Sequence, residues 1–228
     1  MAKVFLSVGH GGKDPGAVGY VVEKDANLTM ALACRNILIQ HGIDVRMSRT
    51  KDENDPLQES IREVNQWRPD LAVDIHNNSG GGNGFEVYYY SGGGVSKYLA
   101  QNIEAEVISI GQNSRGCKTK LNSNGSDYFG FIRETICPAV ICEGFFVDNA
   151  TDYQIANTEA KLKEFGIAYA RGILKTLGIQ YHTFDSDVTE KTGLYHVQVG
   201  AYAIRANAET QLQKVRAAGF TDSFIKQD

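Results

Sequence analysis

The sequence predicts an α/β fold: a mostly parallel, twisted sheet with helices on both faces, followed by a small C-terminal β-α-β module. Three observations lead to this prediction. Short apolar segments typical of strands alternate with longer segments of helical periodicity along residues 1–179. Such alternation is typical of a parallel sheet that is covered on both faces. Residues 180–193 have no periodicity and are interpreted as a linker to a short tail.

Five segments of the main domain are predicted to be strands. Residues 3–8, "KVFLSV", form a short apolar run that ends at a glycine cluster. Residues 139–146, "AVICEGFF", have the apolar character of a buried strand. The other strands are predicted at residues 43–49, 70–76 and 84–90.

Four segments of the main domain are predicted to be helices. In residues 27–42, apolar side chains such as Leu28 and Leu32 fall largely on one helical face, and Gly42 supplies a stop signal. The remaining helices are predicted at residues 57–67, 95–110 and 158–178. The last of these closes a single domain that we expect to run from residue 1 to residue 179.

Composition and charge exclude several classes of function. The 228 residues are 42% hydrophobic, which is enough for one real core and a small appendage. A formal net charge of -4 provides no general attraction to nucleic acid or to an anionic membrane surface. The chain has no apolar run of about 18 residues, so no membrane insertion is expected. Its first residues lack the apolar region of a signal peptide, so synthesis in the cytoplasm without export is expected.

Four residues of catalytic type fall at strand ends or at a helix start. His10 follows the first strand, His76 ends the strand at 70–76, Glu143 follows the apolar "AVIC", and Glu23 lies where the first helix begins. Sites in α/β sheets form beyond the carboxyl ends of the strands, so one cleft could gather all four. Two imidazoles and a carboxylate are a common ligand set for catalytic zinc, and a second carboxylate can accept a proton from water.

Each of these residues also has a purely structural interpretation. The histidines could be ordinary loop residues, and Glu23 could simply favour the positive end of the following helix. Glu143 has the stronger functional indication, because a carboxylate after so apolar a run is costly unless it is paired or catalytic. Burial would raise its pKa toward the range of a general base at neutral pH. The glycine clusters after His10 and His76 match neither GxGxxG nor the P-loop pattern, so nucleotide binding is not indicated.

Three blocks of the sequence resemble the signature blocks of one enzyme family. The blocks are "GHGGKDPGAVG" with "EKD", "DIHNNSGGGNGFEVYYY", and "AVICEGFFVDN". In order and spacing they resemble the zinc-dependent N-acetylmuramoyl-L-alanine amidases of the Amidase_3 type, over about residues 3–178. The resemblance implies hydrolysis of the amide bond between N-acetylmuramic acid and L-alanine in peptidoglycan. It also implies these roles: His10, Glu23 and His76 as ligands of Zn²⁺, Glu143 as the catalytic glutamate, and Asn78 as a substrate-binding residue.

The tail, residues 194–228, resembles the first half of a SPOR module, which implies binding of peptidoglycan glycan strands that lack stem peptides. A strand is predicted at residues 194–202, a helix at 207–219 and a short strand at 222–227. A unit of this size is too small to bury a core alone. We therefore expect it to dock on another surface or to form a homodimer with its own copy.

Two other functions stay open at this point. The chain could be a non-catalytic peptidoglycan-binding protein, or a zinc hydrolase that acts on another wall component. The four retained residues argue against the first, and the gap between His10 and Glu23 does not fit the HxxE or HExxH spacing of common zinc peptidases. The sequence resembles both phage endolysins and sporulation mother-cell autolysins, so action on the wall is expected after holin-mediated release or mother-cell lysis. The abbreviated tail favours an endolysin.

Overall fold

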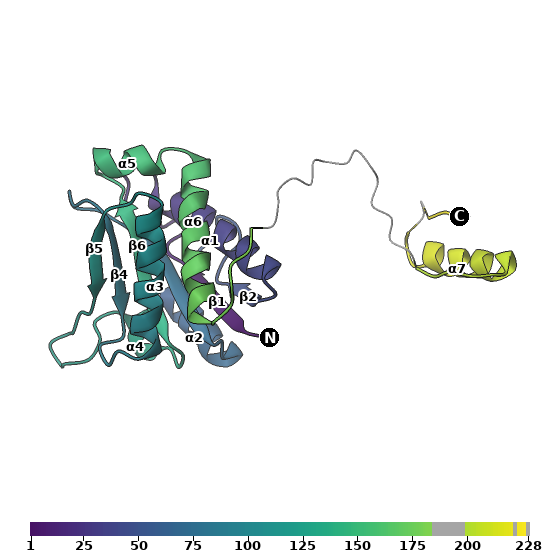
Figure 1. Cartoon of the computed structure of the whole chain (residues 1–228), viewed down its shortest axis with the longest axis horizontal. Helices are drawn as coiled ribbons and strands as arrows, with labels where there is room; N and C mark the ends of the chain where they lie inside the picture. Colours follow the sequence, from purple (N-terminus) through teal and green to yellow (C-terminus); the bar gives the residue numbers. More distant parts are fainter. Residues whose placement is uncertain (184–198, 221–222, 227–228) are drawn as a thin grey trace. The chain divides into compact units, whose positions relative to one another are not determined.

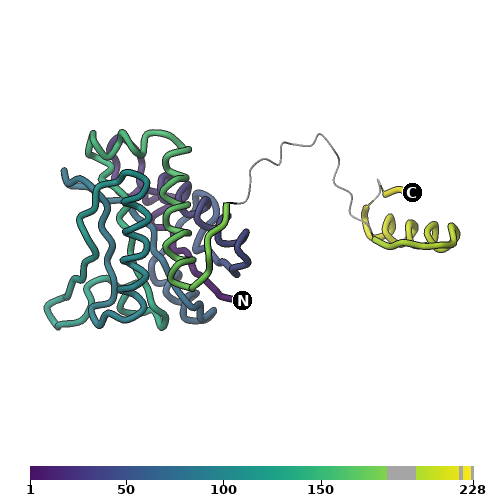
Figure 2. Tube along the Cα trace, viewed as in Figure 1, coloured from purple at the N-terminus to yellow at the C-terminus, as the bar shows by residue number. Residues whose placement is uncertain are grey.

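The computed structural model describes residues 1–183, 199–220 and 223–226 of the chain (Figures 1 and 2). Its contacts divide the chain into two units, Met1–Phe184 and Asp185–Asp228. The first unit contains the sheet and the candidate site. In the second unit the described residues contain one helix, α7 (Arg205–Ala217).

The first unit is built on a six-stranded sheet with the order β2-β1-β3-β6-β4-β5. Neighbouring strands are parallel except for β4 and β6, which are antiparallel. The predicted α/β fold with a mostly parallel sheet is therefore confirmed. The strands are β1 (Lys3–Val8), β2 (Asp44–Met47), β3 (Leu71–Asn78), β4 (Phe85–Tyr89), β5 (Ser114–Lys118) and β6 (Ala139–Phe146).

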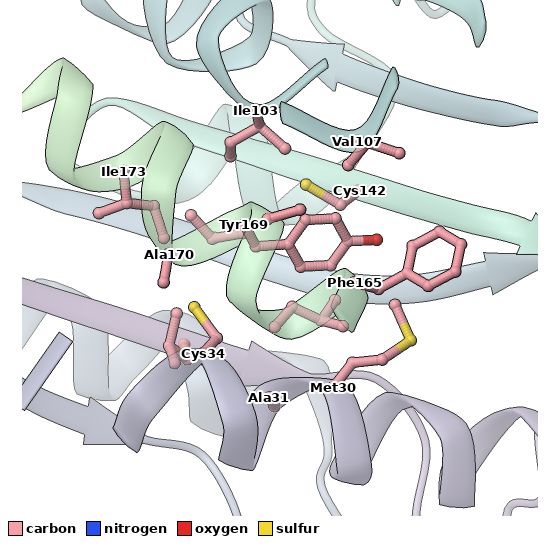
Figure 3. Packing of buried hydrophobic residues seen from close by; sticks show 14 of the residues in the cluster. Met30, Ala31, Cys34, Ile103, Val107, Cys142, Phe165, Tyr169, Ala170 and Ile173 are labelled. Atoms are coloured by element: carbon pink, nitrogen blue, oxygen red, sulfur yellow. The ribbon is translucent and has the colours of Figure 1, made fainter. Parts of the chain in front are cut away.

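Helices cover both faces of this sheet, as Figure 1 shows. The larger core lies under α1 (Glu23–Gln40), α3 (Val95–Ser109) and α6 (Glu159–Thr176), which cover one face; α6 packs against both α1 and α3. Side chains from all three helices meet there, with Tyr169 of α6 between them (Figure 3). A smaller core on the opposite face lies under α2 (Leu57–Trp67) and α4 (Gly130–Glu134).

The alternation of side chains along β6 decides which face receives the polar site. Val140 and Cys142 belong to the larger core, whereas Ala139 and Ile141 belong to the smaller one. Because successive residues of a strand point to opposite faces, Glu143 lies on the face of the smaller core. The short helices on that face leave space beside it, and the candidate site forms there.

Several boundaries and elements differ from the prediction. The first helix begins at Glu23 rather than at residue 27, so Glu23 is its first residue. Strand β5, helix α4 and helix α5 (Ala150–Ala156) were not predicted. The strand β5, "SRGCK", has no apolar alternation and contains Gly116 at φ 95°, where the β4–β5 register shifts. The two helices have only five and seven residues, which is too short for a helical period to be visible in the sequence.

The tail is only partly as predicted. Helix α7 confirms the helix expected at 207–219, but the described parts of both predicted strands, residues 199–202 and 223–226, contain no strand. A strand requires a hydrogen-bonded neighbour, and α7 buries no residue that could hold one in place. The rest of these two predicted strands, residues 194–198, 222 and 227, lies outside the described residues. The same is true of most of the predicted linker, residues 184–193. No helix in the described parts of the chain is long and apolar enough to span a bilayer.

Candidate active site

Two glycines allow the three predicted ligand residues to approach one another closely. A Cβ on Gly9 would lie 2.2 Å from the ring of His76. A Cβ on Gly16, whose φ is 65°, would lie 2.6 Å from both Glu23 and the ring of His10. Only hydrogen fits at these two positions. The glycine-rich sequence around His10 is therefore required by packing as well as by turn geometry.

His10, Glu23 and His76 form one cluster, as the sequence predicted. His10 Nε2 lies 3.2 Å from Glu23 Oε2, and His76 Nδ1 lies 3.1 Å from Glu23 Oε1. The two imidazole rings meet edge to face with their centroids 5.0 Å apart. One ligand atom from each residue lies within 4.8 Å of the other two, so this set could hold a metal ion.

The second nitrogen of each imidazole faces a different carboxylate. His10 Nδ1 lies 2.8 Å from Asp14 Oδ2, and His76 Nε2 lies 3.5 Å from Asp74 Oδ2. Metal-binding histidines usually have such a partner, which fixes the tautomer and the ring orientation. These positions direct His10 Nε2 and His76 Nδ1 toward the shared Glu23. The donor set and its outer carboxylates therefore fit a metal ion.

Buried hydrogen bonds hold the carboxylate of Glu23 in place. The backbone N–H of Ala17 donates to Oε2 at 2.8 Å, and that of Asn77 donates to Oε1 at 3.0 Å. Asn27 is buried behind it and donates from Nδ2 to the carbonyl of Gly9 at 3.0 Å, while Asn77 Nδ2 donates to Asn27 Oδ1 at 2.7 Å. Burial alone would raise the pKa of Glu23, but hydrogen bonds from the two histidines hold this pKa well below its usual range.

The charge of Glu23 also affects the histidines. The hydrogen bond to Glu23 raises the pKa of His10 against the opposing effect of burial. Burial opposes protonation of His76 as well, but Asp74, Glu23 and Glu143 raise its pKa well above the ordinary value. The cluster thus attracts positive charge strongly, which is the property that a cation site requires.

Glu143 lies beside this cluster on the neighbouring strand. It is the register partner of His76 in the parallel pairing of β3 with β6. Burial raises the pKa of Glu143 to about 7; the positive charge of His76 opposes this shift, and the carboxylates of Glu23 and Asp74 add to it. A carboxylate that ionises near neutral pH is suited to accept and return a proton at that pH.

A pocket of about 380 Å³ opens on these residues. It extends from the histidines over the smaller core, between the carboxyl ends of β1, β3 and β6 and the segments around α2 and α4. Its lining residues are Ser7, Gly9, His10, Asp14, Asp55, Pro56, Leu57, Ser60, Asp74, His76, Phe129, Gly130, Phe131, Ile141 and Glu143. Three of the four residues singled out from the sequence line this pocket, and the fourth, Glu23, lies behind the histidines.

Asn78, the predicted substrate-binding residue, lies at the end of β3. Its Nδ2 donates to Glu86 Oε1 at 3.3 Å, and its Oδ1 accepts the N–H of Ser79 at 2.9 Å. It is half-buried and is not among the residues that line the pocket. A direct role in substrate binding stays a prediction.

Arg49 is a residue of the site region that sequence reasoning missed. Its side chain is 2% exposed and donates only to backbone carbonyls, those of Val8, Gly9, Lys24 and Lys51, at 3.1, 3.3, 2.7 and 3.2 Å. It thereby ties the segment before His10 to the first turn of α1. The sequence offers no signal for this role, because the hydrogen-bond partners of Arg49 are backbone carbonyls and not particular side chains.

We expect Arg49→Met to lower the free energy of unfolding of the metal-free protein by about 3 kcal/mol, because buried carbonyls lose their donors. Urea unfolding, followed by circular dichroism, measures this change. Arg62→Met is the matched control, since the side chain of Arg62 is 60% exposed and its ion pair with Glu59 is long, at 3.9 Å. Equal stabilities of the two variants would contradict the role given to Arg49.

A buried carboxylate of raised pKa beside three residues that could hold a cation, at the carboxyl edge of a mostly parallel sheet, is typical of hydrolytic enzymes of the α/β class. Comparison with protein families identifies the particular family of hydrolases. Residues 4–175 match the family described as N-acetylmuramoyl-L-alanine amidase, and residues 168–227 match the SPOR domain. The chain therefore belongs to the N-acetylmuramoyl-L-alanine amidase family, is an enzyme, and has peptidoglycan as its substrate.

Individual proteins agree with this assignment. The sporulation-specific N-acetylmuramoyl-L-alanine amidase of Bacillus subtilis is 34% identical over all of this chain and 86% of its own length. The endolysin of Bacillus phage SPP1 is 31% identical over 78% of this chain and 66% of its own. The catalytic domain of the amidase CwlV from Bacillus (Paenibacillus) polymyxa superposes with a TM-score of 0.71 at 31% identity, covering 79% of this chain and all of that domain.

Proposed function

We propose that the ion bound by His10, Glu23 and His76 is Zn²⁺ and that Glu143 is the catalytic acid and base. The carrying observation is the arrangement of two imidazoles around one buried carboxylate, each imidazole backed by a second carboxylate. Imidazole and carboxylate ligands with an open position are typical of catalytic zinc. When bound, Zn²⁺ supplies Lewis acidity that activates water and polarises the scissile carbonyl.

The side chains of the site would then perform the proton transfers. Glu143 accepts a proton from the attacking water while the oxygen of that water bonds to the lactyl carbonyl carbon of N-acetylmuramic acid. The carbon–nitrogen bond breaks, and Glu143 returns the proton to the departing nitrogen of L-alanine. The products are a lactyl carboxylate and a free amine. Asp14 and Asp74 keep the imidazole rings oriented during this sequence.

Metal analysis tests the identity of the ion. We expect elemental analysis of the purified protein to give one zinc per chain, because the described residues hold one cluster of this kind. Dialysis against a chelator should abolish dye release from labelled cell walls, and added Zn²⁺ should restore it. A metal-free protein that digests walls at the parent rate would overturn the zinc mechanism.

We also propose that the enzyme acts during lysis of a sporulating mother cell. The sporulation-specific relative aligns along the whole chain, tail included, whereas the phage endolysin aligns along 78% of it. This supports the mother-cell setting over release through phage holins. Induction of the transcript during sporulation is the expected result, and expression only after phage induction would contradict it.

For the second unit we propose binding to glycan strands as a homodimer. The SPOR match supports the ligand class. The described residues support self-association, because α7 buries none of its side chains while Ile204 and Phe220 are 61% and 67% exposed. Sedimentation equilibrium should give twice the chain mass, and a monomer at working concentration would contradict pairing.

A further inference from the structure

Beyond Glu143 the sheet face continues into a charged cluster that the mechanism does not use. Glu86 on β4 lies directly opposite Glu143 in the antiparallel pairing with β6, so both side chains are on the same face. Glu86 is only 4% exposed. Arg115 Nε donates to Glu86 Oε1 at 2.8 Å, and Lys118 Nζ donates to Oε2. The sheet therefore presents two cations on β5, two strands from β6, which carries Glu143.

Both cations are held in place by Glu86, and Arg115 has further N–H donors that do not bond to Glu86. Glu86 is fixed further by Asn78 Nδ2 at 3.3 Å and by the hydroxyl of Tyr88 at 3.3 Å. Arg115 uses one of its five N–H groups on Glu86, and its guanidinium lies over the ring of Phe146, 5.2 Å from the centroid. The Arg115 side chain is 40% exposed, which leaves its outer edge accessible to a ligand.

The charges of the cluster do not cancel. Although burial opposes ionisation, Lys118 and Arg115 lower the pKa of Glu86, so it is a carboxylate at neutral pH. Arg115, Lys118 and Glu86 together carry one net positive charge, and Glu143 adds a carboxyl group on the same face. The Lys118 side chain is 31% exposed and contributes to that charge at the surface. The exposed edge of the Arg115 guanidinium, whose remaining N–H groups are not bonded to Glu86, is the part of the cluster suited to bind an anionic group.

We propose that Arg115 and Lys118 form a subsite for a carboxylate of the stem peptide, on the leaving-amine side of the scissile bond. The proposal rests on the amidase mechanism given above. In the substrate, the lactyl carboxyl of the sugar is part of the amide, so free carboxylates lie on the peptide. A guanidinium edge binds a carboxylate through two parallel hydrogen bonds, which favours Arg115 as the primary contact.

The spacing of the sheet sets the reach of this subsite. Strand β5 is two strands from β6, which corresponds to about 10 Å. An extended peptide advances roughly 3.5 Å per residue. The carboxylate recognised would therefore belong to the second or third residue of the stem peptide.

Two matched muropeptides test this subsite: one with free carboxyl groups at the second and third peptide residues, the other with carboxamides there. We expect the parent enzyme to cleave the carboxylate form with a kcat/KM at least 10-fold higher, mainly through KM. Arg115→Gln should remove the preference by slowing the carboxylate form alone, and Lys118→Gln should reduce it. Arg115→Lys, which keeps the charge without the fork, should be intermediate.

Controls separate this proposal from folding and from the mechanism. Arg62→Gln removes an exposed cation from α2 and should keep the parent preference. Calorimetry with the Glu143→Gln variant measures the affinity of the subsite for each of the two released peptides in the absence of hydrolysis. Equal binding and equal cleavage of both forms by the parent would overturn the subsite, as would an unchanged preference in Arg115→Gln. Selective peptide binding without cleavage of either muropeptide by the parent would support the subsite and contradict the mechanism instead.

Discussion

We expect Glu143→Gln to lower kcat for wall hydrolysis by about 10²- to 10⁴-fold, the range for loss of a positioned acid and base. Glutamine has the size of glutamate, so the packing around β6 should be preserved, but its amide cannot take a proton from water at neutral pH. Zinc content should stay at the parent level, because Glu143 lies beside the cluster and is not one of its three members. Dye release from labelled walls and elemental analysis measure the two effects.

The control for this variant is Glu159→Gln, which removes a carboxylate from the exposed start of α6. It should digest walls at the parent rate. If Glu143→Gln also hydrolyses walls at that rate, Glu143 is not the base. If it loses zinc together with activity, its role is structural and the mechanism needs another proton acceptor.

The positions of the four main site residues could be predicted from the sequence because topology alone brings them together. His10 follows the carboxyl end of β1, His76 lies near the carboxyl end of β3, and those strands are adjacent in the sheet. Glu143 was recognised from the energetic cost of a carboxylate in an apolar strand, which holds whatever the details of the fold. Glu23 was placed correctly at a helix start, although the predicted helix boundary was four residues late.

The partners of these residues could not be predicted, because their roles depend on side-chain geometry. Asp14 and Asp74 were not recognised, because nothing in the sequence shows which carboxylate faces the second nitrogen of each imidazole. Arg49 is more instructive: a buried guanidinium that binds only backbone carbonyls has no partner residue whose identity would reveal it. Such a contact is visible only when the backbone path is known.

The charged cluster at the far side of the sheet was hidden for a different reason. Glu86 was within a predicted strand, but Arg115 and Lys118 belong to β5, which lacks alternation. Without that strand, the topology ends at β4 and the two cations have no place relative to Glu143. A missed edge strand therefore removed a candidate binding surface as well as one element of the fold.

We expect Glu23→Gln to weaken zinc binding by more than 100-fold, a larger effect than loss of an outer partner, which typically costs 10- to 100-fold. The substitution removes the one negative charge among the three predicted ligands. It also places an amide NH₂ where Glu23 now accepts hydrogen bonds from Ala17 and Asn77, so one backbone donor would face another donor. Competition with a chromophoric chelator measures the affinity directly.

Asp14→Asn is the comparison that distinguishes a ligand from an outer partner. Asp14 contacts the far nitrogen of His10, accepts the N–H of Gly16 at 3.0 Å and is exposed, so the oxygen of an amide can still accept one of these two hydrogen bonds. Its zinc affinity should fall by about 10-fold, at the low end of the range for outer partners. Parent affinity in Glu23→Gln would remove Glu23 from the ligand set. Equal losses in both variants would mean that the cluster depends on imidazole orientation more than on the carboxylate charge.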